Sequence, residues 1–259
     1  MTTRLHAEGT ESTTGAVELL LVRHGESVGN VAASAAQAAG AEVIDVGLRD
    51  ADVPLTETGS VQAKAFGEWL ADLDPEQRPE TVWCSPYLRA RQTAEVALDA
   101  ARLPLSTTVD ERLRDRELGI LDLLTAVGVE ARFPAEADRR RWLGKFYYRP
   151  PGGESWADVA LRIRSVLADL DRTAMGRRVL VVAHDAVILL FRYVCEGMSE
   201  DDLLALTRRT TVVNASVTQL TRPSGRGLWQ AAAFNMNEHL AAKGVPTTEH
   251  SGDADVVPH

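Results

Sequence analysis

One stretch of sequence decides the fold of this chain: Leu19-Leu20-Leu21-Val22-Arg23-His24-Gly25-Glu26-Ser27-Val28-Gly29-Asn30. Its four apolar residues predict a buried strand, and the glycine that follows Arg23 and His24 ends that strand in a tight turn. The last side chains of such a strand lie at the carboxyl edge of a sheet, where open α/β folds hold their ligands. Arg23 supplies a permanent planar cation suited to a phosphoryl group, and His24 supplies an imidazole that can act as a nucleophile or base near neutral pH.

A second strand carries another arginine to the same kind of position. Thr81–Cys84 is a short apolar segment that is followed directly by Ser85 and Pro86, which fit the first turn of a helix. The N-terminus of a helix at the end of a strand is a ready anion site, and Arg89 lies one turn into the predicted helix. The alternative interpretation is that Arg89 is an ordinary surface charge.

A third strand, Arg178–Ala183, ends in a second histidine, His184. Because the carboxyl ends of parallel strands meet at one edge of a sheet, we expect the two arginines and the two histidines to converge there. Such a set can hold a phosphoryl group without a metal or cofactor, since the arginines donate charge-assisted hydrogen bonds to its oxygens. His24 would then attack the phosphorus, His184 would stabilise the charge around it, and Asn30 would add a further donor.

Composition bounds the class of protein. The chain has 259 residues, of which 45% are hydrophobic and 25% charged, values ordinary for a globular α/β domain with insertions. Its net charge of -9 argues against binding to nucleic acid or to anionic membranes. Cys84 and Cys195 lack the spacing of a metal site, which predicts free thiols in a reducing compartment. Without an apolar leader or a membrane-spanning run, we expect a cytoplasmic protein.

The sequence divides into one expected domain and two terminal segments. The domain covers residues 17–240, and the flanking residues 1–16 and 241–259 are polar and aperiodic, so we expect both to be disordered. Residues 123–150 form an insertion-like stretch within the domain.

The insertion-like stretch contains a run of aromatic residues, Trp142, Phe146, Tyr147 and Tyr148. Two interpretations remain open for this run: a small hydrophobic cluster, or a wall of the substrate pocket. Arg149 follows the aromatic residues directly and is a further candidate for contact with the substrate.

One helix is predicted from its cap and its periodicity. Thr56 fits the N-cap position, where a side-chain oxygen accepts from the first backbone N–H groups. An apolar residue then recurs every four positions and marks the expected buried face, at Val61, Ala65, Trp69 and Leu73.

These motifs, in this order, resemble those of the histidine phosphatase superfamily, which includes the phosphoglycerate mutases. The resemblance lies in Arg23-His24-Gly25-Glu26-Ser27-x-x-Asn30, Leu55-Thr56-Glu57-Thr58-Gly59, Ser85-Pro86-x-x-Arg89-Ala90-x-x-Thr93, Pro151-Gly152-Gly153-Glu154-Ser155 and Asn214–Leu220. It spans roughly residues 17 to 236. The resemblance implies a three-layer α/β/α sandwich with a mostly parallel central sheet, and a reaction that passes through a phosphohistidine.

The resemblance also implies an acid that protonates the leaving group. The corresponding segment of the superfamily places an acid four residues before a glycine, and Asp115 holds that place relative to Gly119. Glu117 lies two residues later, and Asp185 follows the second histidine, where phytases and acid phosphatases of the superfamily carry their acid. Those enzymes are mostly secreted and rich in disulfides, unlike this chain. We therefore expect Asp115 to be the general acid, with Glu117 and Asp185 as alternatives.

The predicted activity is hydrolysis of a phosphomonoester on a small phosphorylated metabolite. Phosphoglycerate mutases carry arginine, threonine and glycine residues for the substrate carboxylate after the first motif. Here Val31–Gly40, a short Ala-rich helix or a mobile flap, contains none of these arginines, and the first arginine to follow is Arg49. Two alternatives remain: mutase-type phosphoryl transfer, and a binding protein that keeps the fold without turnover. The sequence names no substrate, and it leaves the oligomeric state open, including a homodimer.

Overall fold

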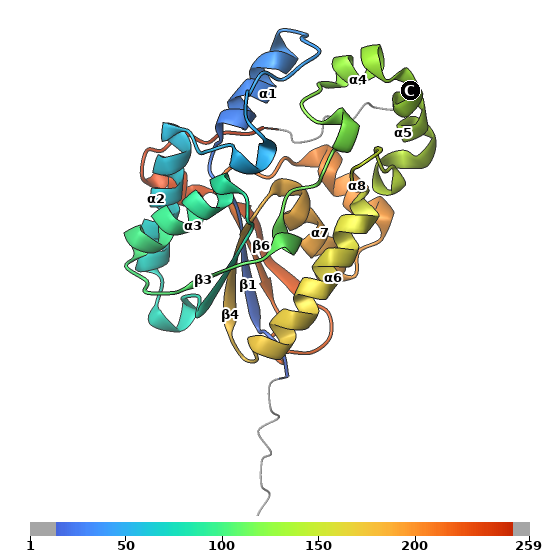
Figure 1. Ribbon diagram of the computed structural model, residues 1–259. Coiled ribbons are helices and arrows are strands. Elements are labelled where there is room, and N and C mark those ends of the chain that lie inside the picture. The colour runs from blue at the N-terminus through green and yellow to red at the C-terminus, as the bar shows by residue number, and fades with distance from the viewer. Residues whose placement is uncertain (1–13, 251–259) are drawn as a thin grey trace, which may run out of the picture.

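The computed structural model describes residues 14–250, whose centre is a six-stranded sheet in the order β3-β2-β4-β1-β5-β6 (Figure 1). The strands are β1 (Glu18–Arg23), β2 (Thr81–Cys84), β3 (Thr107–Val109), β4 (Arg178–Ala183), β5 (Val217–Thr221) and β6 (Gln230–Met236). Strands β3, β2, β4 and β1 pair in parallel, whereas β5 pairs antiparallel with β1 and β6 antiparallel with β5. The mostly parallel sheet expected from the sequence is confirmed.

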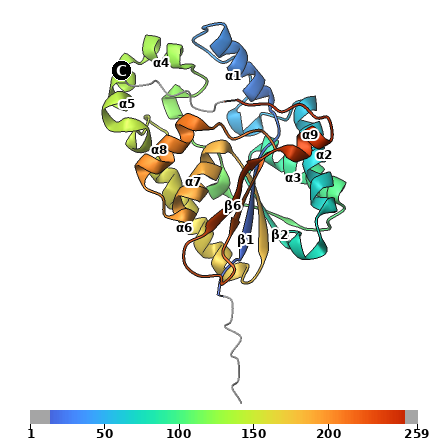
Figure 2. The ribbon, with the colours of Figure 1, turned by 180° about the vertical axis from the view of Figure 1, so that it is seen from behind.

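Helices cover both faces of the sheet, which makes the fold the predicted α/β/α sandwich (Figures 1 and 2). The helices are α1 (Val28–Ala38), α2 (Glu57–Asp72), α3 (Leu88–Ala101), α4 (Ala126–Arg132), α5 (Pro134–Tyr147), α6 (Trp156–Thr173), α7 (Asp185–Glu196), α8 (Glu200–Arg209) and α9 (Glu238–Ala242). Helices α2 and α3 lie on one face and α6 and α7 on the other, while α1, α4 and α5 lie beyond the carboxyl ends of the strands. None of the helices within residues 14–250 has the length and apolar character needed to cross a bilayer.

The apolar run of β1 is explained by burial on both sides of the sheet. Leu19 and Leu21 belong to the core under α6 and α7, whereas Leu20 and Val22 belong to the core under α2 and α3. Successive side chains of a strand point to opposite faces, so a strand covered on both faces is apolar at every position. This burial fixes β1 in the sheet and brings its last residue, Arg23, to the carboxyl edge.

Two glycines let α2 approach the turn that follows β1. A Cβ on Gly25 would lie 2.4 Å from the carbonyl oxygen of Gly59, and a Cβ on Gly59 would lie 2.0 Å from the carbonyl oxygen of Glu26. Real Cβ atoms do not approach so closely, so this contact requires glycine on both sides. Thr56 caps α2 as predicted, since its Oγ1 accepts from the backbone N–H of Gly59 at 3.0 Å.

The buried face of α2 differs from the predicted one. Val61 is 44% exposed, and the residues that α2 buries are Gly59, Gln62, Ala63, Ala65, Phe66, Gly67 and Leu70. A spacing of four residues advances about 400° around a helix of 3.6 residues per turn, so residues spaced strictly by four drift away from a single face. The prediction for Val61 is therefore wrong.

Helix α3 begins later than the sequence indicates. Its first residue is Leu88, its N-cap is Tyr87 and no side chain caps it, so Arg89 is the second residue of the helix. The hydroxyl of Ser85 instead accepts from the backbone N–H of Tyr87 at 3.2 Å. It also contacts Nε2 of His184, the residue that follows β4. Ser85 and Pro86 therefore precede the helix instead of forming its first turn.

The terminal segments differ from expectation where the structure describes them. Ala16 is fully buried, although residues 1–16 were expected to be disordered. In the C-terminal segment, Val245 packs against a small core cluster and the carbonyl of Thr248 accepts from the backbone N–H of Asn214 at 3.1 Å. Figure 2 shows this segment passing from α9 across the carboxyl edge of the sheet toward α1. Residues 1–13 and 251–259 lie outside the described residues, so the prediction for them stays a prediction.

Candidate active site

A cavity of about 630 Å³ lies at the carboxyl edge of the sheet. The end of β1, the start of α3, the loop after β3 and the start of α7 form its floor, while α1, α4, α5 and the C-terminal segment form its walls. The sequence-predicted residues that line it are Arg23, His24, Asn30, Arg89, Asp115, Glu117 and Asp185. His184 lies directly against this floor, with its ring centroid 5.1 Å from that of His24. Arg23 and His24 at the end of β1, Arg89 at the start of α3 and His184 after β4 thus converge as the sequence predicts.

His24 is held as a neutral imidazole whose unprotonated nitrogen, Nε2, faces Arg89. It is 3% exposed, and its Nδ1 lies 2.7 Å from the carbonyl oxygen of Gly25. Because a carbonyl can only accept, we assign the ring proton to Nδ1, which leaves Nε2 as the acceptor of the Nε–H of Arg89 at 3.3 Å. Burial, followed by the nearby charges of Arg89, His184 and Arg23, holds the pKa of His24 well below its usual 6.5. Nε2 is therefore a nucleophilic nitrogen at neutral pH.

Arg23 is 2% exposed, and its Nε is the one nitrogen of the guanidinium without a partner among the described residues. Its two terminal nitrogens donate to the carbonyl oxygens of Val212 and His250, the latter at 3.0 Å. Its Nε has no hydrogen-bond partner within residues 14–250. A buried donor without a partner costs about 1–3 kcal/mol, so an anionic oxygen that enters the cavity and accepts from this N–H is favoured.

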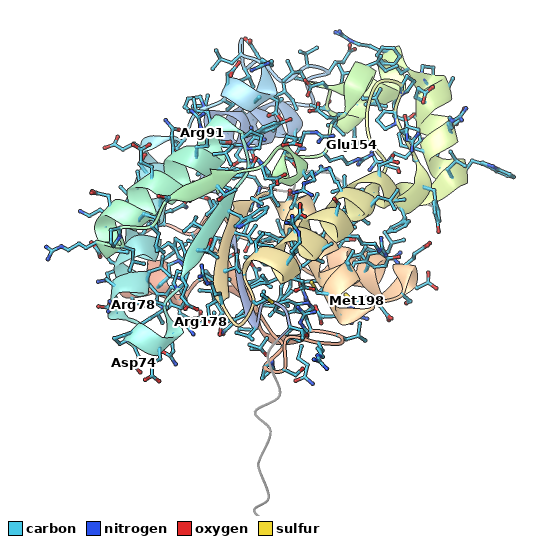
Figure 3. The ribbon with its side chains drawn as sticks, turned by 60° about the horizontal axis from the view of Figure 1, so that its bottom comes forward. Asp74, Arg78, Arg91, Glu154, Arg178 and Met198 are labelled. Carbon is cyan, nitrogen blue, oxygen red and sulfur yellow. The ribbon has the colours of Figure 1, made fainter. Side chains whose placement is uncertain are left out.

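Arg89 is surrounded by acceptors. Its terminal nitrogens donate to Asp50 three times, to the backbone oxygen at 2.7 Å and to the two carboxylate oxygens at 2.9 and 3.2 Å. They also donate to Oδ2 of Asp115 at 3.1 Å. Burial opposes the charge of Arg89, but these two carboxylates outweigh it and raise the pKa of the guanidinium. The neighbouring Arg91, by contrast, is exposed on α3 (Figure 3). The interpretation of Arg89 as an ordinary surface charge is therefore wrong, whereas Arg91 is such a charge.

His184 is fully buried between a hydroxyl and a carboxylate. Its Nε2 lies 2.8 Å from Oγ of Ser85, and its Nδ1 lies 3.2 Å from Oδ2 of Asp115. The latter contact lacks the alignment of a hydrogen bond, so we treat it as electrostatic. The ring also packs edge-on against Tyr87 at 5.2 Å between centroids. These contacts fix the ring beside His24.

Of the three candidate acids, Asp115 has the most contacts with the cationic groups. Burial alone would raise its pKa, but His184, Arg89 and the backbone N–H of Arg116 outweigh burial and hold the pKa of Asp115 well below its usual range. Glu117 instead accepts from the hydroxyl of Tyr87 at 2.8 Å, and its side chain is 48% exposed.

Asp185 begins α7, and its carboxylate accepts from the backbone N–H of Ala186 at 2.8 Å.

Asn30 forms a capping box with Ser27 at the start of α1. Its Oδ1 accepts from the backbone N–H of Ser27 at 3.1 Å and from Nδ2 of Asn214 at 3.3 Å. With its oxygen occupied, Asn30 offers its amide nitrogen as the remaining group, which suits the expected role as a donor.

The prediction for Arg149 is wrong. Its guanidinium is 62% exposed and pairs with Asp158, and the residue does not line the cavity. Asp158 is also the capping residue in the first turn of α6, so the chain that leaves α5 carries Arg149 toward this helix end. On the neighbouring side, Glu154, which Figure 3 labels, binds Arg114 and Arg162.

The aromatic run of the insertion-like stretch agrees in part with the hydrophobic-cluster interpretation and does not form a wall of the cavity. Phe146 and Tyr148 are buried, with Phe146 in the main core, whereas Trp142 is 87% and Tyr147 55% exposed. None of these four lines the cavity, although the same helix contributes Arg140 and Lys145 to its wall. The stretch therefore lines the cavity with Arg140 and Lys145 and not with its aromatic residues.

Sequence reasoning missed three groups of this site. Asp50 was not among the predicted site residues, and Ser85 was expected only in the first turn of a helix. His250 belongs to the expected disordered tail, yet its backbone oxygen binds Arg23 and its Nδ1 lies 2.6 Å from Oγ of Ser34. None of these residues belongs to a repeated or periodic pattern. Among residues 14–250, no group of three or more His, Cys, Asp or Glu side chains has a geometry that could hold a metal ion.

Comparison with known proteins identifies the family of this site. The chain is 32% identical over 197 residues to a 2,3-bisphosphoglycerate-dependent phosphoglycerate mutase of Rhizobium meliloti, across 75% of this chain and 86% of that protein. It is 34% identical over 171 residues to a 6-phosphofructo-2-kinase/fructose-2,6-bisphosphatase of Caenorhabditis elegans. The matched region covers 66% of this chain but only 32% of that longer protein.

The structure is also similar to that of the mycobacterial glucosyl-3-phosphoglycerate phosphatase, with a TM-score of 0.67 and 28% identity over 85% of this chain and 99% of that one. Residues 19–236 match the sequence profile of the histidine phosphatase superfamily (branch 1). Apart from Glu18, the first residue of β1, this range contains all six strands, and it includes both His24 and His184. The chain belongs to the histidine phosphatase superfamily.

Proposed function

We propose that this protein is a phosphomonoester hydrolase that acts on a small phosphorylated metabolite through a phosphohistidine at His24. The observation that carries the proposal is the state of two buried groups that line one cavity. His24 presents an unprotonated Nε2 whose lone pair accepts a 3.3 Å hydrogen bond from Arg89, which attack on phosphorus would replace with the N–P bond. Arg23 presents a buried Nε–H without a partner among residues 14–250. A nucleophile beside an unsatisfied cationic donor suits attack on an anionic phosphorus centre.

The proposed reaction has two steps. In the first, Nε2 of His24 attacks phosphorus, the N–P bond forms as the P–O bond breaks, and the leaving oxygen takes a proton from Asp115. In the second, water attacks the phosphohistidine, returns a proton to Asp115 and releases inorganic phosphate and free His24. Arg23, His184 and the amide of Asn30 stabilise the charge on the phosphoryl oxygens, so no metal or cofactor enters the proposal.

Asp115 must hold a proton before the first step, although its pKa is low in the arrangement described above. A phosphate dianion that binds Arg89 and His184 changes this balance in two ways. It adds negative charge beside Asp115, and it competes for the positive groups that stabilise the carboxylate. Both changes raise the pKa of Asp115, which is the direction that a general acid needs.

Phosphoglycerate mutase-type transfer is the second candidate function. The relatives at 32% identity are mutases, and the cavity wall carries the cations Arg116, Arg140 and Lys145. The segment after the first motif favours hydrolysis, because the residues of α1 that line the cavity are Gly29, Asn30, Ala33, Ser34 and Gln37, without an arginine.

We expect the protein to release inorganic phosphate from small phosphomonoesters and to form little 2-phosphoglycerate. The experiment supplies 3-phosphoglycerate with 2,3-bisphosphoglycerate as primer and measures both products over time, alongside a panel of phosphorylated metabolites. Efficient formation of 2-phosphoglycerate without release of phosphate would establish the mutase function instead. Absence of both products across the panel would favour a binding protein.

We expect Asp115→Asn to discriminate between leaving groups. A p-nitrophenolate leaves readily without a proton, whereas an alkoxide does not, so the variant should retain much of its rate on p-nitrophenyl phosphate. Its rate on an alkyl phosphate should fall by a further factor on the order of 10²–10⁴, the usual contribution of general acid catalysis. The measurement is the ratio of kcat/KM for the two substrates.

The variants Glu117→Gln and Asp185→Asn serve as matched controls, because both residues line the same cavity. Their ratios of kcat/KM should stay close to that of the wild type. A selective loss on the alkyl phosphate in Asp185→Asn, with none in Asp115→Asn, would place the general acid on the second histidine motif.

A further inference from the structure

Every N–H group of Arg89 already has a partner within the protein. An arginine side chain carries five N–H donors. One donates to Nε2 of His24, one to Asp115, and the remaining three go to Asp50, to its backbone oxygen and to both of its carboxylate oxygens. The guanidinium is also 6% exposed. A phosphoryl group therefore finds no free donor on Arg89 while Asp50 keeps this position.

The contact between Asp50 and Arg89 copies the geometry that a phosphoryl group would use. Two carboxylate oxygens face two terminal nitrogens, at 2.9 and 3.2 Å, in the paired arrangement by which arginine binds both carboxylates and phosphates. We infer that Asp50 is a built-in competitor for the phosphoryl group, a specificity-determining residue that occupies the paired donors of Arg89 and yields them only to a stronger anion. This inference rests on the proposed function, in which Arg89 binds the phosphoryl group.

Of the two carboxylates on Arg89, Asp50 is the one with fewer other contacts. Asp115 also contacts His184 at 3.2 Å and accepts from the backbone N–H of Arg116 at 2.8 Å. Within residues 14–250, the carboxylate of Asp50 accepts hydrogen bonds from Arg89 alone. A dianion that approaches Arg89 repels both carboxylates, and the one without further donors leaves at the lower cost.

The segment that carries Asp50 packs loosely enough to move. The side chain of Asp50 is 40% exposed, that of Arg49 is 76% exposed and Leu48 is 45% exposed. Gly47 has a φ of +65° with nothing within 4 Å of its Cβ position, so the chain can bend there without meeting a neighbour. Beyond Asp50 the chain is anchored, since Val53 is 1% exposed. Displacement of Asp50 therefore breaks few contacts besides those with Arg89.

The consequence is a threshold for ligand binding. An anion must bind Arg89 more strongly than an internal carboxylate does, which a phosphate dianion can achieve and a singly charged anion cannot readily do. Removing the charge of Asp50 should therefore strengthen the binding of phosphate, because Arg89 is then released at a lower cost. A residue that merely oriented Arg89 would have the opposite effect, since its removal would weaken the site.

The test is titration calorimetry with inorganic phosphate on the wild type, Asp50→Asn, Asp50→Glu and the control Asp52→Asn. Asp52 lies in the same short turn and, among the residues that the structure describes, pairs only with the exposed Arg49. We expect the Kd for phosphate to fall roughly three- to tenfold in Asp50→Asn, the range set by a partly exposed charged pair. Asp50→Glu, which keeps the charge, and Asp52→Asn should bind as the wild type does.

An unchanged or weaker affinity of Asp50→Asn for phosphate would overturn the inference. A tighter affinity in Asp52→Asn of the same size would also overturn it, because the effect would then reflect net charge alone. Calorimetry needs no turnover, so the two claims separate. If Asp50→Asn binds phosphate more tightly but the wild type hydrolyses no phosphomonoester, the inference stands and the proposed function fails.

Discussion

His24→Ala is expected to lose phosphatase turnover by a factor on the order of 10⁴ or more, the scale at which removal of a nucleophile acts. Among the described residues that line the cavity, His24 alone presents a buried, unprotonated ring nitrogen whose pKa lies well below 6.5. The low pKa has a second consequence. Any acidic limb of the pH–rate profile that arises from protonation of His24 should lie below pH 6.5. The measurement is kcat/KM on p-nitrophenyl phosphate across pH.

A control is needed because His24 is buried and packs against His184. His239→Gln alters another buried histidine, 7% exposed, whose Nε2 contacts the carbonyl oxygen of Ala215 outside the cavity. This variant should retain turnover within a few-fold. Circular dichroism should show that His24→Ala is folded. A folded His24→Ala with turnover within tenfold of the wild type would contradict the assignment of the nucleophile.

Arg23→Lys is expected to lower kcat/KM by a factor on the order of a hundred, although the charge is kept. Arg23 performs two tasks with one planar group, since its terminal nitrogens bind the oxygens of Val212 and His250 while its Nε is left to donate into the site. Lysine has a single nitrogen and cannot do both. The expected loss corresponds to one donor that stabilises the transition state.

Arg49→Lys is the matched control for this prediction. Its side chain is 76% exposed and pairs with Asp52 on the surface, so the exchange should change kcat/KM by no more than the error of the assay. Near-normal turnover in Arg23→Lys would show that charge rather than planar geometry is what the site requires. The role proposed for the planar guanidinium of Arg23 would then be wrong.

The sequence predicts those parts of the molecule that regular structure positions. The run from Leu19 to Val22 indicates a strand buried on both faces, and the packing of alternate residues into two cores confirms it. Once three strands are known to be parallel, their last residues must meet at one edge, so the convergence of Arg23, His24 and His184 follows from topology. These predictions succeed because each depends on the hydrophobic pattern of a strand or on the position at which a strand ends.

The missed features depend on contacts that leave no pattern in the sequence. The partners of Arg23 are backbone oxygens of Val212 and His250, and every residue type has such an oxygen. Asp50 lies in a short turn, where no periodicity indicates which side chains face inward. The prediction for Arg149 is wrong because its position beside aromatic residues in the sequence does not indicate its actual partner, the carboxylate of Asp158. Loop and tail contacts of this kind need the three-dimensional structure.

The most direct test of the central claim is to identify the residue that carries the phosphoryl group. Wild-type protein would be mixed with a labelled phosphomonoester, quenched within milliseconds in base, digested and mapped by mass spectrometry. The account predicts a base-stable, acid-labile phosphoryl group on Nε2 of His24, and its absence from His24→Ala. A label on His184, or hydrolysis of the ester under the same conditions with no covalent phosphoenzyme formed, would contradict it.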